Sequence, residues 1–216
     1  QDLMSLDLVR EKKLQWAQEN PSLCLFPYNA LQIRQSWNTP GEISYSCCCN
    51  LDVNNKNITD RTDPFADLKY SMNAGRLPDL CKKCIDEEAH GGQSERIRSI
   101  LGASDADLDV FARTRQIRRF DLMIQFSSVC NLSCRSCDPA SSTTYSKITN
   151  SHEFDFLAND ITENQEFWQE LTASIKEKIY QQEHFDLHLM GGESLIQPGL
   201  EKLFDWLIEQ DLAKDI

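Results

Sequence analysis

Residues 119–139 read RFDLMIQFSSVCNLSCRSCDP, and this stretch decides the fold of the second half of the chain. Apolar and polar residues alternate from Arg119 to Phe126, which predicts a strand with one strongly apolar face. A loop with three cysteines in CxxxCxxC spacing follows this strand: Cys130, Cys134 and Cys137. Asp138 and Pro139 then predict a helix that extends to about Thr149, because Pro is favoured in the first helical turn.

The three cysteines predict an iron-sulfur cluster at the end of the strand. Thiolate is a soft ligand that suits iron-sulfur clusters, zinc and copper(I). Three thiolates leave one iron of a four-iron cluster with an open position, where a small molecule can bind and be activated. Because the loop leads into a helix N-terminus, free N–H groups and the helix dipole favour an anionic cluster there. Buried free thiols, or part of a zinc site, are the alternatives.

The second half of the chain repeats the order strand, helix, strand, helix. A long helix is expected from about Glu163 to Tyr180, and a strand from His184 to Met190 ends in Gly191-Gly192-Glu193. A further amphipathic helix is expected from Leu200 to Gln210. The apolar stripe of the long helix is interpreted as packing: Phe167, Trp168, Leu171, Ile175 and Ile179. This alternation predicts parallel βαβ units and an α/β fold.

CxxxCxxC, with Gly-Gly-Glu at the end of the next parallel strand, resembles the radical S-adenosylmethionine (radical SAM) superfamily over about residues 117–216. The resemblance implies that a 4Fe-4S cluster is bound by Cys130, Cys134 and Cys137. It implies that the amino end of the methionine moiety of SAM is bound by Gly191, Gly192 and Glu193. In that family a reduced cluster passes one electron to the sulfonium of SAM, and the resulting 5′-deoxyadenosyl radical abstracts a hydrogen from the substrate.

Two positions and the length of the chain depart from the family pattern. Ser136 precedes the third cysteine, where the family commonly has an aromatic residue near the adenine, and it remains a candidate for cofactor binding. Ser194 follows Gly-Gly-Glu, where Pro is common. The partial (β/α) barrel of the family has six strands, and this sequence supplies about two. We therefore expect the chain to be the front portion of an enzyme.

A β-hairpin is expected further upstream. Short strands are predicted over residues 30–34 and 42–48, on either side of the turn Asn38-Thr39-Pro40-Gly41. Pro fixes φ and Gly tolerates positive φ, which suits such a turn. The second strand would carry three consecutive cysteines, and side chains alternate along a strand. Cys47 and Cys49 would then share one face and Cys48 the other, so that only one of them is expected to meet Cys24.

The upstream cysteines resemble the twitch domain, an auxiliary-cluster domain attached to many radical SAM enzymes, over about residues 22–98. The match rests on Cys24, Gly41, Ile43, Cys47-Cys48, the Cys81-x-x-Cys84 pair, and the trailing Glu88, Gly91, Ser94 and Arg96. The resemblance implies a closed iron-sulfur cluster held by Cys24, Cys47, Cys81 and Cys84, with Cys48 or Cys49 as alternatives to Cys47. Its expected role is electron transfer or stabilisation of a small domain, and a four-thiolate zinc site is the alternative.

These patterns predict two domains. Residues 1–98 are expected to form a small α+β metal-binding domain with a β-hairpin, and residues 99–216 to begin a radical SAM domain. Helices are also expected over 5–19, 63–73 and 104–115, the last because Ser104 and Asp107 resemble a capping box. Residues 85–102 show no apolar core pattern and are taken to hold the boundary.

Composition narrows the class of protein further. The 216 residues carry a net charge of −12, which disfavours nucleic-acid binding because phosphate backbones require clustered Lys and Arg. No apolar run approaches the roughly 20 residues of a membrane helix, and the first residues lack a hydrophobic signal region. The nine cysteines, several of them in CxxC-type clusters, favour metal ligation in a reducing compartment. We therefore expect a cytoplasmic protein.

The sequence thus predicts a radical SAM enzyme, or its N-terminal portion, with an auxiliary iron-sulfur cluster. A peptide or protein is the expected substrate, with a small molecule as the alternative, and an external donor would supply electrons. The alternative function is a non-catalytic interaction module that binds zinc or iron-sulfur clusters.

Overall fold

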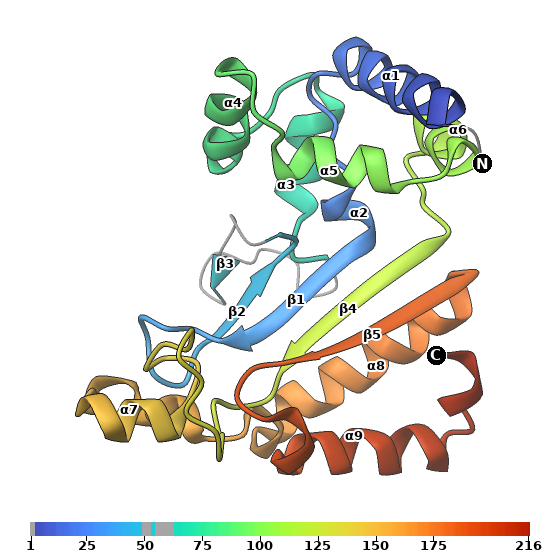
Figure 1. Ribbon diagram of the computed structural model, residues 1–216. Helices are drawn as coiled ribbons and strands as arrows, with labels where there is room; N and C mark the ends of the chain where they lie inside the picture. Colours follow the sequence, from blue (N-terminus) through green and yellow to red (C-terminus); the bar gives the residue numbers. More distant parts are fainter. Residues whose placement is uncertain (1–2, 49–52, 55–62) are drawn as a thin grey trace. The chain divides into compact units, whose positions relative to one another are not determined.

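The computed structural model describes residues 3–48, 53–54 and 63–216 of the chain (Figure 1). Its elements are α1 (Leu3–Glu19), α2 (Phe26–Asn29), β1 (Ala30–Gln35), β2 (Ile43–Ser46), β3 (Val53–Asn54), α3 (Ala66–Asn73), α4 (Lys82–Ala89), α5 (Glu95–Gly102), α6 (Asp105–Thr114), β4 (Arg119–Gln125), α7 (Thr143–Thr149), α8 (Gln165–Gln181), β5 (His184–Met190) and α9 (Pro198–Glu209). Short 3-10 helices are η2 (Asp79–Cys81), η3 (His152–Ala158), η4 (Ile161–Glu163), η5 (Ser194–Ile196) and η6 (Ala213–Asp215). Among the described residues, none of the helices combines the length and the apolar character that crossing a membrane requires.

The chain divides into two compact units, each built from segments that are separated in the sequence. The first unit comprises residues 1–31, 46–52 and 59–118. The second comprises residues 32–45, 53–58 and 119–216. The upstream cysteines therefore belong to the first unit, and the CxxxCxxC loop with Gly-Gly-Glu belongs to the second.

Helices form most of the first unit. Phe111 of α6 is fully buried, and its ring contacts the rings of Trp16 and Tyr28. The Ser104 side chain caps α6 by accepting a hydrogen bond from the Asp107 N–H at 3.1 Å, and the Ser104 hydroxyl donates to the Asp107 carboxylate at 2.6 Å. The expected helix start at Ser104 is confirmed, because the two residues satisfy each other at the first turn.

A mixed sheet runs through the second unit in the strand order β3-β2-β1-β4-β5. β2 and β3 are antiparallel, whereas β4 and β5 are parallel, with Phe120 opposite Phe185. The alternation expected in β4 is confirmed, since Phe120, Leu122 and Ile124 are buried. The chain is therefore α/β, as expected, with a parallel pair of strands where the two motifs lie.

α8 connects the two parallel strands and buries the stripe predicted for it. The buried residues are Phe167, Leu171, Ile175 and Ile179. The ring of Trp168 lies edge to face with that of Trp206 in α9, with 6.4 Å between the ring centroids. The helix begins at Gln165 because the Asn164 side chain accepts a hydrogen bond from the Phe167 N–H at 3.1 Å.

Two of the sequence expectations about helices were wrong. The helix expected at Asp138-Pro139 begins only at Thr143. The Asp138 carboxylate instead accepts hydrogen bonds from Ala140 N–H and Ser141 N–H and closes its own turn, and Ser142 caps α7. Residues 85–102, expected to lack a core pattern, contain α5, in which Ile100 is fully buried.

Candidate functional site

The first cysteine of the CxxxCxxC loop is fixed to the start of α7. The Cys130 N–H donates to the Thr143 hydroxyl oxygen at 3.1 Å, and the Thr144 hydroxyl donates to the Cys130 carbonyl at 2.6 Å. Within the loop, the Leu132 N–H lies 3.4 Å from the Cys130 sulfur and donates to it.

All three thiols of this loop are free and reach solvent. Cys130 and Cys137 are half-buried and Cys134 is exposed. Ser136 is exposed on the same loop. A donor set of sulfur alone suits a soft metal centre.

The Gly-Gly-Glu turn is hydrogen-bonded to residues that flank the cysteine loop. The Glu193 N–H donates to the Val129 carbonyl at 2.9 Å, and the Gly192 N–H donates to the Ser141 carbonyl at 3.2 Å. The structure therefore brings together two motifs that are far apart in the sequence, at the ends of two neighbouring parallel strands. Ligands of open α/β sheets bind at this end of the strands.

Both glycines of the turn are required by its geometry. Gly191 has φ +78° and Gly192 has φ +49°, a region that residues with a Cβ rarely adopt. A Cβ at Gly192 would lie 2.1 Å from the Val129 carbonyl oxygen, and one at Gly191 would lie 2.2 Å from Cγ of Gln125. The turn therefore packs directly against the end of β4.

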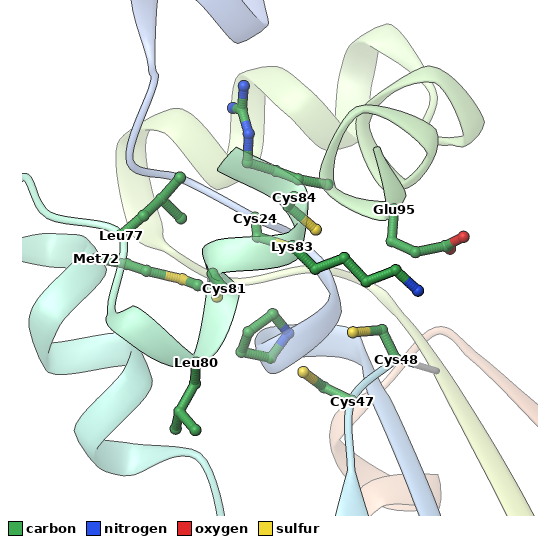
Figure 2. A pocket seen from close by; sticks show the side chains of 12 residues that line it. Cys24, Cys47, Cys48, Met72, Leu77, Leu80, Cys81, Lys83, Cys84 and Glu95 are labelled. Carbon is green, nitrogen blue, oxygen red and sulfur yellow. The ribbon is translucent and has the colours of Figure 1, made fainter. Parts of the chain in front are cut away.

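Five cysteines of the first unit line one pocket, which Figure 2 shows from close by: Cys24, Cys47, Cys48, Cys81 and Cys84. They come from the segment after α1, the bend after β2, and the junction of η2 with α4. The sulfur atoms of Cys47 and Cys48 both point toward the turn that carries Cys81 (Figure 2).

The expectation that only one of the consecutive cysteines meets Cys24 was wrong. β2 ends at Ser46, so Cys47 and Cys48 lie in a bend to which the alternation of a strand does not apply. Both line the pocket with Cys24. Cys49 lies outside the described residues.

Burial favours the neutral thiol form of Cys24 and Cys81. It raises the pKa of Cys24 to about 12 and that of Cys81 to about 11. The pKa of Cys47 is raised far above its ordinary range, mainly by a hydrogen bond with Cys48 and secondly by burial. The positive charge of Arg96 acts in the opposite direction on Cys81. A metal or cluster that binds here must therefore displace protons, which makes its affinity depend on pH.

Arg96 joins the cysteine pocket to an ion pair in which the arginine is buried and the Glu88 carboxylate is half-buried. It lines the pocket, and its guanidinium donates to the Glu88 carboxylate at 2.9 and 2.5 Å. Burial alone would raise the pKa of Glu88, but hydrogen bonds from Arg96 and Ser94 outweigh it and lower that pKa. The same Ser94 hydroxyl oxygen caps α5. Glu88, Ser94 and Arg96 are thus one network, which only the family resemblance had singled out.

A site for a single zinc ion requires ligand atoms that converge closely. With Zn–S bonds of about 2.3 Å, a tetrahedral zinc ion needs its thiolates about 3.8 Å apart. No three Cys, His, Asp or Glu side chains in the described ranges converge closely enough to hold one metal ion.

Three supporting residues were missed by sequence reasoning: Thr143, Thr144 and Gln197. Each bonds to the main chain of a motif, and nothing in the apolar pattern marks them.

Comparisons of the chain with protein-family models, with curated proteins and with solved structures gave no match.

Proposed function

We propose that this chain is a radical SAM enzyme, or the front portion of one, with an auxiliary metal site in its first unit. Cys130, Cys134 and Cys137 would hold a 4Fe-4S cluster, and Gly191-Gly192-Glu193 would bind the amino end of SAM. When bound, these groups supply reductive cleavage of SAM and a 5′-deoxyadenosyl radical for hydrogen abstraction.

The hydrogen bonds between the two motifs carry the proposal. SAM must meet an open iron and an amino-binding turn at the same time, so these two features have to lie side by side. The bonds from Glu193 N–H to Val129 O and from Gly192 N–H to Ser141 O hold the turn against the ends of the cysteine loop. Neither motif alone would point to SAM as strongly as their juxtaposition does.

The residues of the chain have separable tasks in this proposal. The Glu193 carboxylate supplies the negative charge that an ammonium group requires. The Leu132 N–H contacts the Cys130 sulfur, and the hydroxyls of Thr143 and Thr144 fix the position of that cysteine. Ser136, exposed on the same loop, is the candidate for the adenine side of the cofactor.

The parallel pair β4 and β5 would form the first strands of a partial (β/α) barrel. β5 is the last strand in the order of the described sheet, so a further parallel strand could pair with its outer edge. The helices α8 and α9 follow the two strands in the alternation that such a barrel requires.

The auxiliary site would hold a cluster with Cys24, Cys81, Cys84 and a cysteine of the Cys47-Cys48 pair as its ligands. Electron transfer or stabilisation of the first unit is its proposed role. A peptide or protein is the proposed substrate class, an external donor supplies electrons, and the cytoplasm is the proposed setting.

Anaerobic reconstitution of the 216-residue chain with iron and sulfide tests the proposal. We expect acid-labile sulfide in the product, an electron paramagnetic resonance signal that changes when SAM is added, and 5′-deoxyadenosine release under a strong reductant. Cys134→Ala should lose the iron of one cluster, the SAM-dependent change and the release. Ser133→Ala, at the preceding exposed position of the loop, should keep all three.

Equal iron, sulfide and 5′-deoxyadenosine in wild type and Cys134→Ala would overturn the proposal. Zinc without labile sulfide in both sites would instead favour a non-catalytic interaction module. Two free-thiol motifs on one chain make that alternative concrete, because a structural metal also stabilises a small unit.

A further inference from the structure

Gln197 is a buried amide that bridges two backbone groups at the candidate SAM site. The residue is 2% exposed. Its oxygen accepts a hydrogen bond from the Ser127 N–H at 3.2 Å, and its nitrogen donates to the Gly191 carbonyl at 2.6 Å. The two partners fix the orientation of the amide, because an N–H requires an acceptor and a carbonyl requires a donor.

The two backbone groups belong to the bases of the two motifs. Ser127 follows β4 and leads into the loop that carries Cys130, and Gly191 is the first residue of the Gly-Gly-Glu turn. Gln197 therefore links the motifs at their bases, in addition to the backbone bonds made by Gly192 and Glu193. A side chain, and not only the main chain, sets the position of the turn.

Gln197 is itself held firmly. It precedes α9, whose first residue is Pro198, so the backbone there has a fixed φ. The next residue, Gly199, donates its N–H to the buried Asp160 carboxylate at 2.6 Å, and a Cβ at Gly199 would lie 2.6 Å from the Phe126 ring. The start of α9 is thereby tied to the core of the second unit, which leaves the Gln197 amide little freedom to move.

We infer that Gln197 is a positioning residue, which fixes Gly191-Gly192-Glu193 against the cysteine loop so that the turn can receive the amino group of SAM. The inference rests on the proposed function for the identity of the ligand. The placement of the turn, in contrast, is a property of the chain without any cofactor and can be measured separately.

Gln197→Glu separates positioning from bulk packing. A carboxylate of nearly equal size can still accept from the Ser127 N–H, but it cannot donate to the Gly191 carbonyl and repels it. Gln197→Asn keeps the amide and shortens the side chain by one methylene, so that it can no longer reach both partners. Gln210→Glu is the matched control, because it makes the same charge change at the exposed end of the same helix.

Hydrogen exchange of the cofactor-free chain, followed by NMR, is the first measurement. In Gln197→Glu or Gln197→Asn, we expect the Gly192 and Glu193 amides to exchange on the order of tenfold faster, since opening of the turn becomes easier. The amides of Leu122 and Leu187, in the paired strands β4 and β5, should keep their protection. Gln210→Glu should leave every one of these rates unchanged.

Equilibrium dialysis of SAM with the reconstituted chain is the second measurement. Gln197→Asn should weaken binding about tenfold at equal iron content, which corresponds to about 1.4 kcal/mol. Unchanged exchange at Gly192 and Glu193 would overturn the inference, and so would a uniform loss of protection across β4 and β5, which marks a general packing role. Absence of SAM binding by the wild type, with the exchange result as expected, would overturn the proposed function and leave the placement of the turn intact.

Discussion

Arg96→Ala should destabilise the first unit far more than Arg98→Ala, although both arginines lie on α5. The Arg96 side chain is 5% exposed and pairs with Glu88, whose side chain is 24% exposed. Its guanidinium also donates to the carbonyls of Ala17 and Leu23 at 3.4 and 3.3 Å. Arg98, in contrast, is 58% exposed and pairs with Glu95 of its own helix.

The expected magnitude follows from what Arg96→Ala leaves behind. The Glu88 carboxylate loses its charged partner and keeps only the Ser94 hydroxyl, and the carbonyls near the end of α1 lose a donor. Removal of one member of a fully buried ion pair costs about 3–5 kcal/mol. Because the Glu88 side chain is 24% exposed and its charge can regain some water, we expect no more than the lower end of this range, about 3 kcal/mol. An exposed pair contributes about 0.2–1 kcal/mol, which bounds the effect of Arg98→Ala. For a unit of about 100 residues, 3 kcal/mol lowers Tm by roughly 12 °C or more.

Urea denaturation of the metal-free chain, read by hydrogen exchange in peptides from α1, α4 and α5, measures both variants in the same unit. Arg96→Lys tests the geometry, since an ammonium keeps the charge but cannot form the two-pronged contact with Glu88. We expect it to recover less than half of the loss. If Arg96→Ala lowers the free energy of unfolding no more than Arg98→Ala does, the buried network does not stabilise the unit and the reasoning fails.

Three further predictions concern the two sites. Cys47→Ser and Cys48→Ser should each retain the auxiliary iron while the double variant loses it, measured as iron and sulfide per chain, because both thiols line the pocket; loss in one single variant would assign one fixed ligand. In urea denaturation, Gly192→Ala should lower the free energy of unfolding by about 2–4 kcal/mol, because the left-handed backbone is strained by a Cβ that also clashes with a backbone oxygen. Gly41→Ala should lower it by only about 1–2 kcal/mol, because the Cβ meets open space and only the strain remains. Unfolding of the metal-free chain should become easier as pH rises from about 9 toward 12, because burial raises the pKa of Cys24 from 9.0 to about 12 and favours the neutral thiol in the folded state; Cys24→Ser should flatten this dependence, and equal slopes would contradict it.

Much of the second unit could be predicted from the sequence because its apolar residues repeat with clear periods. The alternation from Arg119 to Phe126 found β4 to within one residue of its end, and the strand from His184 to Met190 matches β5. Parallel pairing of these strands then places the residues that follow each strand at one edge of the sheet. The proximity of the cysteine loop to Gly-Gly-Glu is therefore a consequence of strand period and connection length.

The bend at Cys47 and Cys48 could not be predicted in the same way. Strand alternation holds only while the ladder of backbone hydrogen bonds continues, and β2 ends at Ser46. The three consecutive cysteines carry no signal for that end, because cysteine is neither a strand breaker nor a turn former. Strand alternation therefore predicted opposite faces for Cys47 and Cys48, but the chain leaves the sheet there and both thiols line the pocket.

The helix α5 and Gln197 were missed for a common physical reason. Both contribute to the fold through buried polar side chains that find partners inside the protein: Arg96 bonds to Glu88 and to main-chain carbonyls, and Gln197 bonds to main-chain groups. Periodicity counts such residues as exposed, so a helix whose buried face includes an arginine looks like a linker.

Each candidate site is supported by a buried polar side chain that is not itself a proposed ligand of the cofactor. Arg96 borders the thiol pocket, and Gln197 stands behind the Gly-Gly-Glu turn. A buried polar group of this kind acts on its site by holding backbone or charge in place, so its loss should weaken ligand binding while every thiol remains present. Iron content measured beside ligand affinity separates the two cases: substitution of a ligand lowers both, whereas substitution of a support lowers affinity first.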